Sequence, residues 1–208
     1  MALARVISAG ARRVPVWAVW AVALAPVPWL FWAGATGGLG VEPVEVLEHR
    51  LGLYALQFLI AGLAITPLRR HLGVNLLRFR RALGLIAFTY VALHLAVWLL
   101  LDVQDPARVW SDILKRPYIT IGMGAFLLMV PLALTSNDWA VRRLGAAMWR
   151  RLHRVTYAVA VLGALHFVML SKGLHLEPLF YMGAIVALLA LRLRPRGAGR
   201  GLWRADSA

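Results

Sequence analysis

Two histidines, His94 and His166, lie inside long apolar stretches in near-matching local sequence, Ala92-Leu93-His94-Leu95 and Ala164-Leu165-His166-Phe167. An ionisable side chain at membrane depth is costly unless it faces the protein interior and has a partner. Imidazole is a common ligand of haem iron, so two such histidines on separate helices indicate a haem held between them. The alternative is two buried histidines that hydrogen-bond to the backbone or to each other.

The composition is that of an integral membrane protein. Of the 208 residues 61% are hydrophobic and 15% are charged, and the mean hydropathy is +0.71. The chain has no cysteine, which excludes disulfides, iron–sulfur clusters and thiolate-ligated haem. Its net charge of +14 does not indicate nucleic-acid binding, because the arginines cluster in short segments between apolar runs, where they orient the chain and contact anionic headgroups.

The apolar runs predict an all-α bundle of six transmembrane helices that forms a single domain over residues 1–208. The spans are expected at about 14–32, 51–68, 82–101, 119–134, 155–170 and 178–191. Pro26 and Pro28 should kink the first span or end it early. The first run could also be a cleaved signal peptide, but its length, tryptophans and prolines favour a retained helix.

The basic residues predict the orientation. If both termini are cytoplasmic, 18 of the 23 arginines and lysines fall on the cytoplasmic side, and every short loop agrees in sign. We therefore expect a multi-pass protein of the bacterial inner membrane with both termini in the cytoplasm.

This topology places the two histidines at one depth. Helix three runs outward from Arg81 to His94, and helix five runs outward from Arg154 to His166. The two separations are nearly equal and correspond to roughly 20 Å of helical rise. Both side chains should therefore lie in the outer half of the membrane, as a bis-histidine haem requires.

His153 lies about 20 Å below His166 on the same predicted helix and about 140° away around its axis. At this inner level helix three carries Arg80 and Arg81 instead of a histidine. His153 could ligate a second haem iron, hold a haem propionate, or sit among the lipid headgroups. The other three histidines, His49, His71 and His175, are expected to be solvated.

Five arginines cluster at the predicted inner loop between helices two and three: Arg69, Arg70, Arg78, Arg80 and Arg81. The cluster could simply fix the topology, or it could bind a flavin phosphate or the propionates of an inner haem, because arginine forks match phosphate and carboxylate. Without a glycine-rich dinucleotide motif we expect no nicotinamide or adenine site. Gly122 and Gly124 are expected to allow close packing between helices.

With these residues in view, the chain resembles the MsrQ (YedZ) family over residues 51–194, its ferric-reductase-like core. The resemblance rests on the following segments together: Ile65-Thr66-Pro67-Leu68-Arg69-Arg70, Arg80-Arg81-Ala82-Leu83-Gly84-Leu85, Leu93-His94-Leu95, Arg116-Pro117-Tyr118-Ile119-Thr120, Leu134-Thr135-Ser136, Arg151-Leu152-His153 and His166.

The resemblance implies a membrane electron-transfer subunit that binds haem b and FMN, with His94, His153 and His166 matching the family's functional histidines. It implies electron flow from a cytoplasmic flavin reductase or the membrane quinone pool to a periplasmic MsrP-like molybdoprotein that repairs methionine sulfoxide. The chain is then a subunit of an oxidoreductase system and not its catalytic subunit. Related oxidases carry two histidines on each of two helices, whereas helix three here has one.

Two other functions remain open on the sequence alone. One is a self-contained ferric or quinone reductase that uses the same haem. The other is a transporter or scaffold whose histidines only form hydrogen bonds, although the inverted repeats and broken midplane helices common in transporters are not evident.

Overall fold

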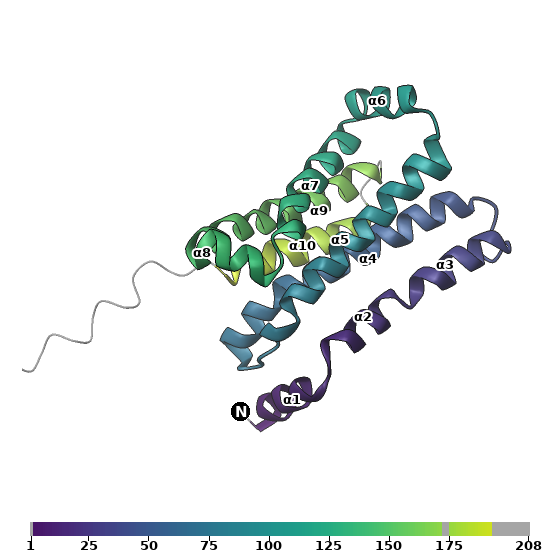
Figure 1. Ribbon diagram of the computed structural model, residues 1–208. Coiled ribbons are helices and arrows are strands. Elements are labelled where there is room, and N and C mark those ends of the chain that lie inside the picture. Colours follow the sequence, from purple (N-terminus) through teal and green to yellow (C-terminus); the bar gives the residue numbers. More distant parts are fainter. Residues whose placement is uncertain (1, 172–174, 193–208) are drawn as a thin grey trace, which may run out of the picture.

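A computed structural model of the chain describes residues 2–171 and 175–192 (Figure 1). The elements are α1 (Ala2–Arg13), α2 (Val16–Leu24), α3 (Pro26–Ala35), α4 (Pro43–Leu72), η1 (Leu77–Phe79), α5 (Arg80–Val97), η2 (Trp98–Val103), α6 (Pro106–Lys115), α7 (Pro117–Leu134), α8 (Asp138–Leu152), η3 (His153–Val155), α9 (Thr156–Leu170) and α10 (Leu176–Ala190). The described residues contain no strand, which confirms the predicted all-α class.

Among the described residues, five helical segments are long and apolar enough to cross a membrane: Val16–Ala35, Pro43–Leu72, Leu77–Val103, Pro117–Leu134 and Asp138–Leu170. The sixth predicted span corresponds to α10, an apolar helix of 15 residues, or about 22 Å at the rise of an α-helix. The fold is therefore a membrane helix bundle. Its arginine-rich end is called the inner end below, following the predicted orientation, and the opposite end is called the outer end.

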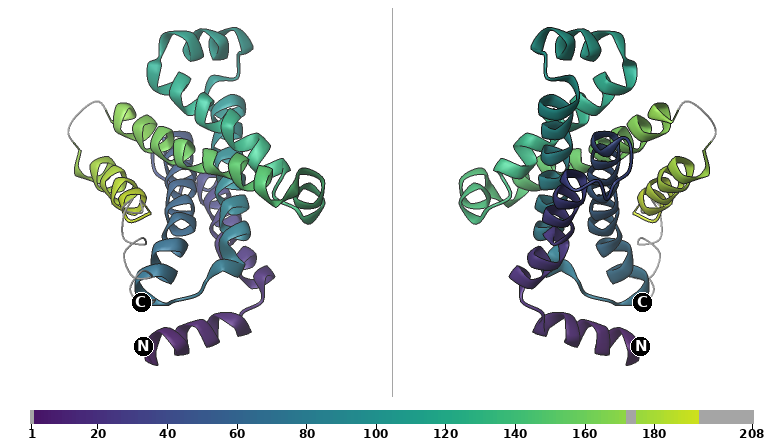
Figure 2. Two further views of the ribbon diagram at one scale, coloured as in Figure 1. Left: turned by 90° about the vertical axis from the view of Figure 1, so that its left-hand side faces the viewer. Right: turned by 90° about the vertical axis from the view of Figure 1, so that its right-hand side faces the viewer.

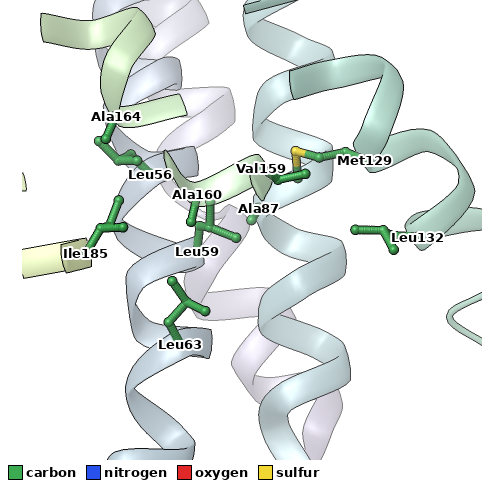
Figure 3. Close-up of a cluster of buried hydrophobic side chains, with 10 residues drawn as sticks. All are labelled: Leu56, Leu59, Leu63, Ala87, Met129, Leu132, Val159, Ala160, Ala164 and Ile185. Carbon is green, nitrogen blue, oxygen red and sulfur yellow. The ribbon is translucent and has the colours of Figure 1, made fainter. Parts of the chain in front are cut away.

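The centre of the bundle is the hairpin of α4 and α5, against which α7, α9 and α10 pack (Figures 1 and 2). Side chains from all five helices point toward one another in the larger core cluster, which Figure 3 shows. Leu59 and Leu63 of α4 meet Val159 of α9 and Ile185 of α10 there. This packing fixes α5 and α9, the helices that carry His94 and His166.

The first span breaks where the prolines predict. α2 ends at Leu24 and α3 begins at Pro26, because proline lacks the amide hydrogen that would continue the helix. Beside the break, the fully buried Tyr90 of α5 donates a hydrogen bond to the carbonyl of Ala23 (2.6 Å) and stacks on Phe58. This contact ties the broken span to the central hairpin.

Beyond His94, α5 widens into the π-helical segment η2, which the sequence did not predict. The segment ends at Gln104, whose φ of 57° is in the left-handed region. π-helical turns often occur at functional sites. Here the wide turn carries Trp98 and Asp102, which line the same cavity as His94.

Three amphipathic helices, α1, α6 and α8, lie in segments outside the predicted spans. The side chain of Asp105 caps α6 and that of Asn137 caps α8 by accepting backbone hydrogen bonds. α8 bends at Gly145, whose φ of 75° glycine adopts without a steric penalty. α1 and α6 lie crosswise at opposite ends of the bundle (Figure 2).

Candidate functional site

The rings of His94 on α5 and His166 on α9 lie side by side. Their centroids are 6.4 Å apart and their planes are 79° apart, close to perpendicular. The two residues are 72 positions apart in the sequence, and the packing of α4, α5, α7 and α9 brings them together. The expectation that both histidines reach one depth of the bundle is therefore confirmed.

A backbone carbonyl holds each of these rings. The Nδ1 of His94 lies 2.9 Å from the carbonyl oxygen of Glu48, and the Nδ1 of His166 lies 2.7 Å from that of Tyr118. A carbonyl oxygen can only accept, so each Nδ1 carries the hydrogen and donates it. In the neutral imidazole the Nε2 lone pair is then available, which is the usual arrangement of a metal-bound histidine.

A glycine stands four residues after each residue whose carbonyl accepts the histidine hydrogen bond, on the same helix. A Cβ atom at Gly52, four residues after Glu48, would lie 3.3 Å from the His94 Nδ1. A Cβ atom at Gly122, four residues after Tyr118, would lie 2.8 Å from the His166 Nδ1. The missing side chains let each ring approach its helix closely enough to reach the carbonyl.

These contacts refine one prediction and overturn another. Gly122 does allow close packing, between α7 and the His166 ring of α9. Gly124 does not, since a Cβ atom there would meet nothing within 4 Å. The role of Gly52 was missed, and its only signal in the sequence is a glycine inside a long apolar helix.

The two rings border an outer cavity of about 250 Å³, whose wall is mostly apolar and includes Leu56, Met123 and Phe126. A metal–imidazole bond is about 2 Å long and the ring centre lies about 1 Å farther, so two imidazoles on opposite sides of one metal ion have centres about 6 Å apart. The observed 6.4 Å between centroids matches this spacing. The ring spacing, the available Nε2 atoms and the apolar wall together fit bis-histidine ligation of haem iron.

Polar groups collect at the outer edge of this cavity, among them Asp102, Arg116 and Tyr118. Arg116 pairs with Asp112 (3.2 Å) and donates a hydrogen bond to the Tyr118 hydroxyl (3.3 Å). That hydrogen bond raises the pKa of Arg116, so the guanidinium stays charged. The segment that orients His166 therefore also carries a fixed positive charge.

A second cavity of about 310 Å³ lies nearer the inner end and is bordered by Arg80, Arg81 and His153. The His153 ring stacks on Trp149 with a centroid distance of 3.8 Å, and its Nε2 lies 3.1 Å from the Thr135 hydroxyl oxygen. Thr135 donates its one hydroxyl hydrogen to the Pro131 carbonyl (2.6 Å), so it accepts from His153. Arg80 and Arg81 border the same cavity as His153, which agrees with the prediction that they lie at its depth on helix three.

The outer and inner cavities share part of their walls. Leu59, Met129 and Val159 line both. Phe126, which lines the outer cavity, stacks nearly parallel on Phe88, which lines the inner one, with centroids 5.9 Å apart and planes at 6°. The chain thus builds two compartments at different depths, with an apolar partition between them.

The five clustered arginines do not converge. Arg80 and Arg81 reach the inner cavity, and Arg81 also pairs with Asp138 (2.6 Å). Arg70 donates to the carbonyls of Leu191 and Arg192, and Arg78 donates to those of Ala11 and Arg12. Arg69 is exposed.

The remaining histidines lie at the surface, as expected. His49, His71 and His175 are all exposed. His49 borders the mouth of the outer cavity and lies against Phe167, with a centroid distance of 5.6 Å. His71 is 3.5 Å from the Leu191 carbonyl oxygen.

Comparison with protein families defines the class of this bundle. A family model described as "Ferric reductase like transmembrane component" matches residues 50–164. The matched stretch contains His94 and His153 and ends two residues before His166. The chain is thus a multi-pass membrane protein with a ferric-reductase-like domain.

Curated relatives narrow the class further. A protein from Agrobacterium fabrum is 50% identical over 179 residues, covering 86% of this chain and 83% of the relative. Relatives from Rhizobium meliloti (49%, covering 85% and 82%) and Brucella anthropi (46%, covering 89% and 84%) are similarly close. Each is named "Protein-methionine-sulfoxide reductase heme-binding subunit MsrQ". The chain belongs to the MsrQ family, and no solved structure matches it.

Proposed function

We propose that this chain is the haem-binding membrane subunit of a protein-methionine-sulfoxide reductase system, in which His94 and His166 would hold the iron of a haem b. The observation that carries the proposal is the pairing of the two rings at 6.4 Å, each with Nδ1 engaged by a carbonyl. The name of the relatives supports haem as the cofactor. A bound haem would supply a one-electron relay inside the membrane, where electrons cannot cross unaided.

The chain's own contribution is position and environment. The Glu48 and Tyr118 carbonyls fix the tautomer and orientation of the rings, which raises the basicity of the ligating nitrogens. The apolar wall around Leu56 and Phe126 keeps water away from the site, and burial of this kind tunes the redox potential of haem iron.

The inner cavity is proposed as a second cofactor compartment, with Arg80 and Arg81 beside His153. Because the His153 Nε2 donates to Thr135, the ligating atom of this histidine would be its Nδ1. Trp149 and Thr135 hold the His153 ring from two sides. Arginine forks suit carboxylates such as haem propionates, and Arg80 and Arg81 both line this cavity. Two compartments along the bundle suit a carrier that takes electrons at one face and releases them at the other.

The proposal that the chain also binds FMN rests on the family resemblance alone. The sequence suggests the inner-loop arginines, Arg69, Arg70, Arg78, Arg80 and Arg81, as a site for a flavin phosphate or a haem propionate. Arg70 and Arg78 instead bind backbone carbonyls of other segments. These five arginines therefore do not fit one flavin phosphate, and no flavin site is assigned to them.

The proposed direction of flow is from a cytoplasmic flavin reductase or a membrane quinone to a periplasmic MsrP-like molybdoprotein, across the bacterial inner membrane. The test is reconstitution of the purified chain in vesicles with a donor on the inner side and an MsrP-like protein and methionine sulfoxide outside. We expect methionine to form only when the chain and both components are present. Reduction of ferric citrate or quinone at the same rate without the partner would instead favour a self-contained reductase.

A further inference from the structure

The side chains of helix α1 form three faces around its axis: an apolar face, a basic face and a third face of small residues. At about 100° per residue, Leu3, Val6 and Ile7 fall within one arc of roughly 100°. Their side chains are exposed by 71%, 68% and 42%. The three arginines of this helix, Arg5, Arg12 and Arg13, occupy a second arc of similar width, and Ala4 and Ser8 lie between the arcs on the third face.

The third face attaches α1 to the rest of the protein. Ser8 is buried, and its hydroxyl accepts a hydrogen bond from the Asn75 amide (3.0 Å). Arg78 donates to the carbonyls of Ala11 and Arg12. The helix is therefore fixed against the inner loop between α4 and α5, with its apolar and basic faces turned outward.

The short connection between α1 and the first span places α1 at the membrane surface. Only Val14 and Pro15 separate it from α2, the start of the first span. Trp17, the second residue of that span, is 72% exposed, and tryptophan is enriched where headgroups meet hydrocarbon. Figure 2 shows α1 lying crosswise at the inner end of the bundle, as a helix in the plane of the interface would.

We propose that α1 binds the inner leaflet of the membrane, with Leu3, Val6 and Ile7 entering the boundary of headgroups and acyl chains. Arg5, Arg12 and Arg13 bind the phosphates of anionic lipids there. This inference does not depend on the proposed electron-transfer function.

Charge favours lipid over the chain's own C-terminal segment as the occupant of this face. Residues 193–208 carry Arg194, Arg196, Arg200 and Arg204 against the single acid Asp206. Their charge has the sign of the α1 arginines, so the two segments repel. Anionic headgroups attract the same arginines.

The test uses the absence of cysteine from the chain, which makes an introduced cysteine a unique labelling site. Full-length Ile7→Cys and Ala9→Cys are labelled with a fluorophore and reconstituted in vesicles of phosphatidylcholine and phosphatidylglycerol. The two positions lie about 160° apart around the helix, which makes Ala9→Cys the matched control. Lipids with a quencher on the acyl chain should quench the label at position 7 strongly and that at position 9 weakly, and iodide in the water should do the reverse.

A second measurement tests the headgroup contact. With the three arginines present, lipid quenching at position 7 should be stronger in vesicles that contain phosphatidylglycerol than in vesicles that lack it. Replacing Arg5, Arg12 and Arg13 with glutamine should remove this difference. The backbone carbonyls that hold Arg78 remain in this variant.

Three results would overturn the proposal. Equal quenching by iodide at both positions would place the whole helix in water. Protection of position 7 from both quenchers would indicate a protein partner or a second copy of the chain. Loss of lipid quenching only after deletion of residues 193–208 would make that segment necessary for the contact.

Discussion

Gly122 of α7 lies directly against the His166 ring, so closely that a methyl group on it would come within 2.8 Å of the ring's Nδ1. Real Cβ atoms do not approach that closely, so any side chain there must displace the ring or the helix. Gly52 and His94 repeat the relationship at 3.3 Å. Each histidine is therefore held by a pair of groups on one helix: a carbonyl that accepts its hydrogen and a glycine that makes room for it.

Gly122→Ala should weaken haem binding. The added methyl group separates His166 from the Tyr118 carbonyl, and overpacking of this kind costs roughly 1–3 kcal/mol. The haem-to-protein ratio after purification should fall, and the midpoint potential of the remaining haem should shift. Gly124→Ala is the matched control, because a Cβ atom there meets nothing within 4 Å. Equal effects of the two substitutions would show that helix α7, and not the contact with the ring, is responsible.

His153→Ala should leave the outer site largely intact and slow electron entry from the inner side. His153 borders the inner cavity, whereas His94 and His166 border the outer one. The reduction rate with a donor at the inner face and the Soret spectrum should be measured together. Trp149→Leu, which removes the stacked ring, should have a weaker effect of the same kind. Complete loss of haem from His153→Ala would contradict the division into two compartments.

Tyr90→Phe should destabilise the attachment of the first span. The substitution removes the hydrogen bond to the Ala23 carbonyl in the bundle interior, which is worth about 1 kcal/mol. Thermal unfolding in detergent should show a lower midpoint for Tyr90→Phe than for Tyr54→Phe, which changes a neighbouring ring of the same cluster. An unchanged midpoint would mean that packing alone holds the first span.

The orientation can be tested with reporter fusions. Fusions at Val41 and Gln104 should report the outside of the cell, and fusions at Gly73 and Asn137 should report the cytoplasm, because the arginines cluster at the ends that carry Gly73 and Asn137. The reversed pattern would exchange the inner and outer cavities and with them the proposed direction of electron flow.

The sequence predicts the helical class, the break at Pro26 and the pairing of His94 with His166 correctly. These features depend on hydropathy, on proline chemistry and on a rise per residue that hardly varies within a helix. Equal distances from the basic ends of two spans therefore place two side chains at one depth without knowledge of the packing.

The features that the sequence missed depend on contacts between helices. Nothing in the local sequence indicates that the Glu48 and Tyr118 carbonyls accept hydrogen bonds from distant histidines. The five inner-loop arginines are close in sequence, but closeness in sequence does not determine which groups their side chains contact. Arg70 binds a carbonyl at the end of α10, and Arg78 binds a carbonyl of α1. Because α1 is amphipathic, it does not form an apolar run and was not predicted.

The most direct test of the account is the haem content and optical spectrum of His94→Ala and His166→Ala, each purified beside His71→Ala. We expect each of the first two variants to lose most of the haem bound at the outer site, because each lacks one of the two histidines that would hold the iron. His71 is exposed and lies away from both cavities, so His71→Ala should keep the spectrum of the unaltered protein. An unaltered haem content and spectrum in either His94→Ala or His166→Ala would contradict the claim that these two histidines hold the haem.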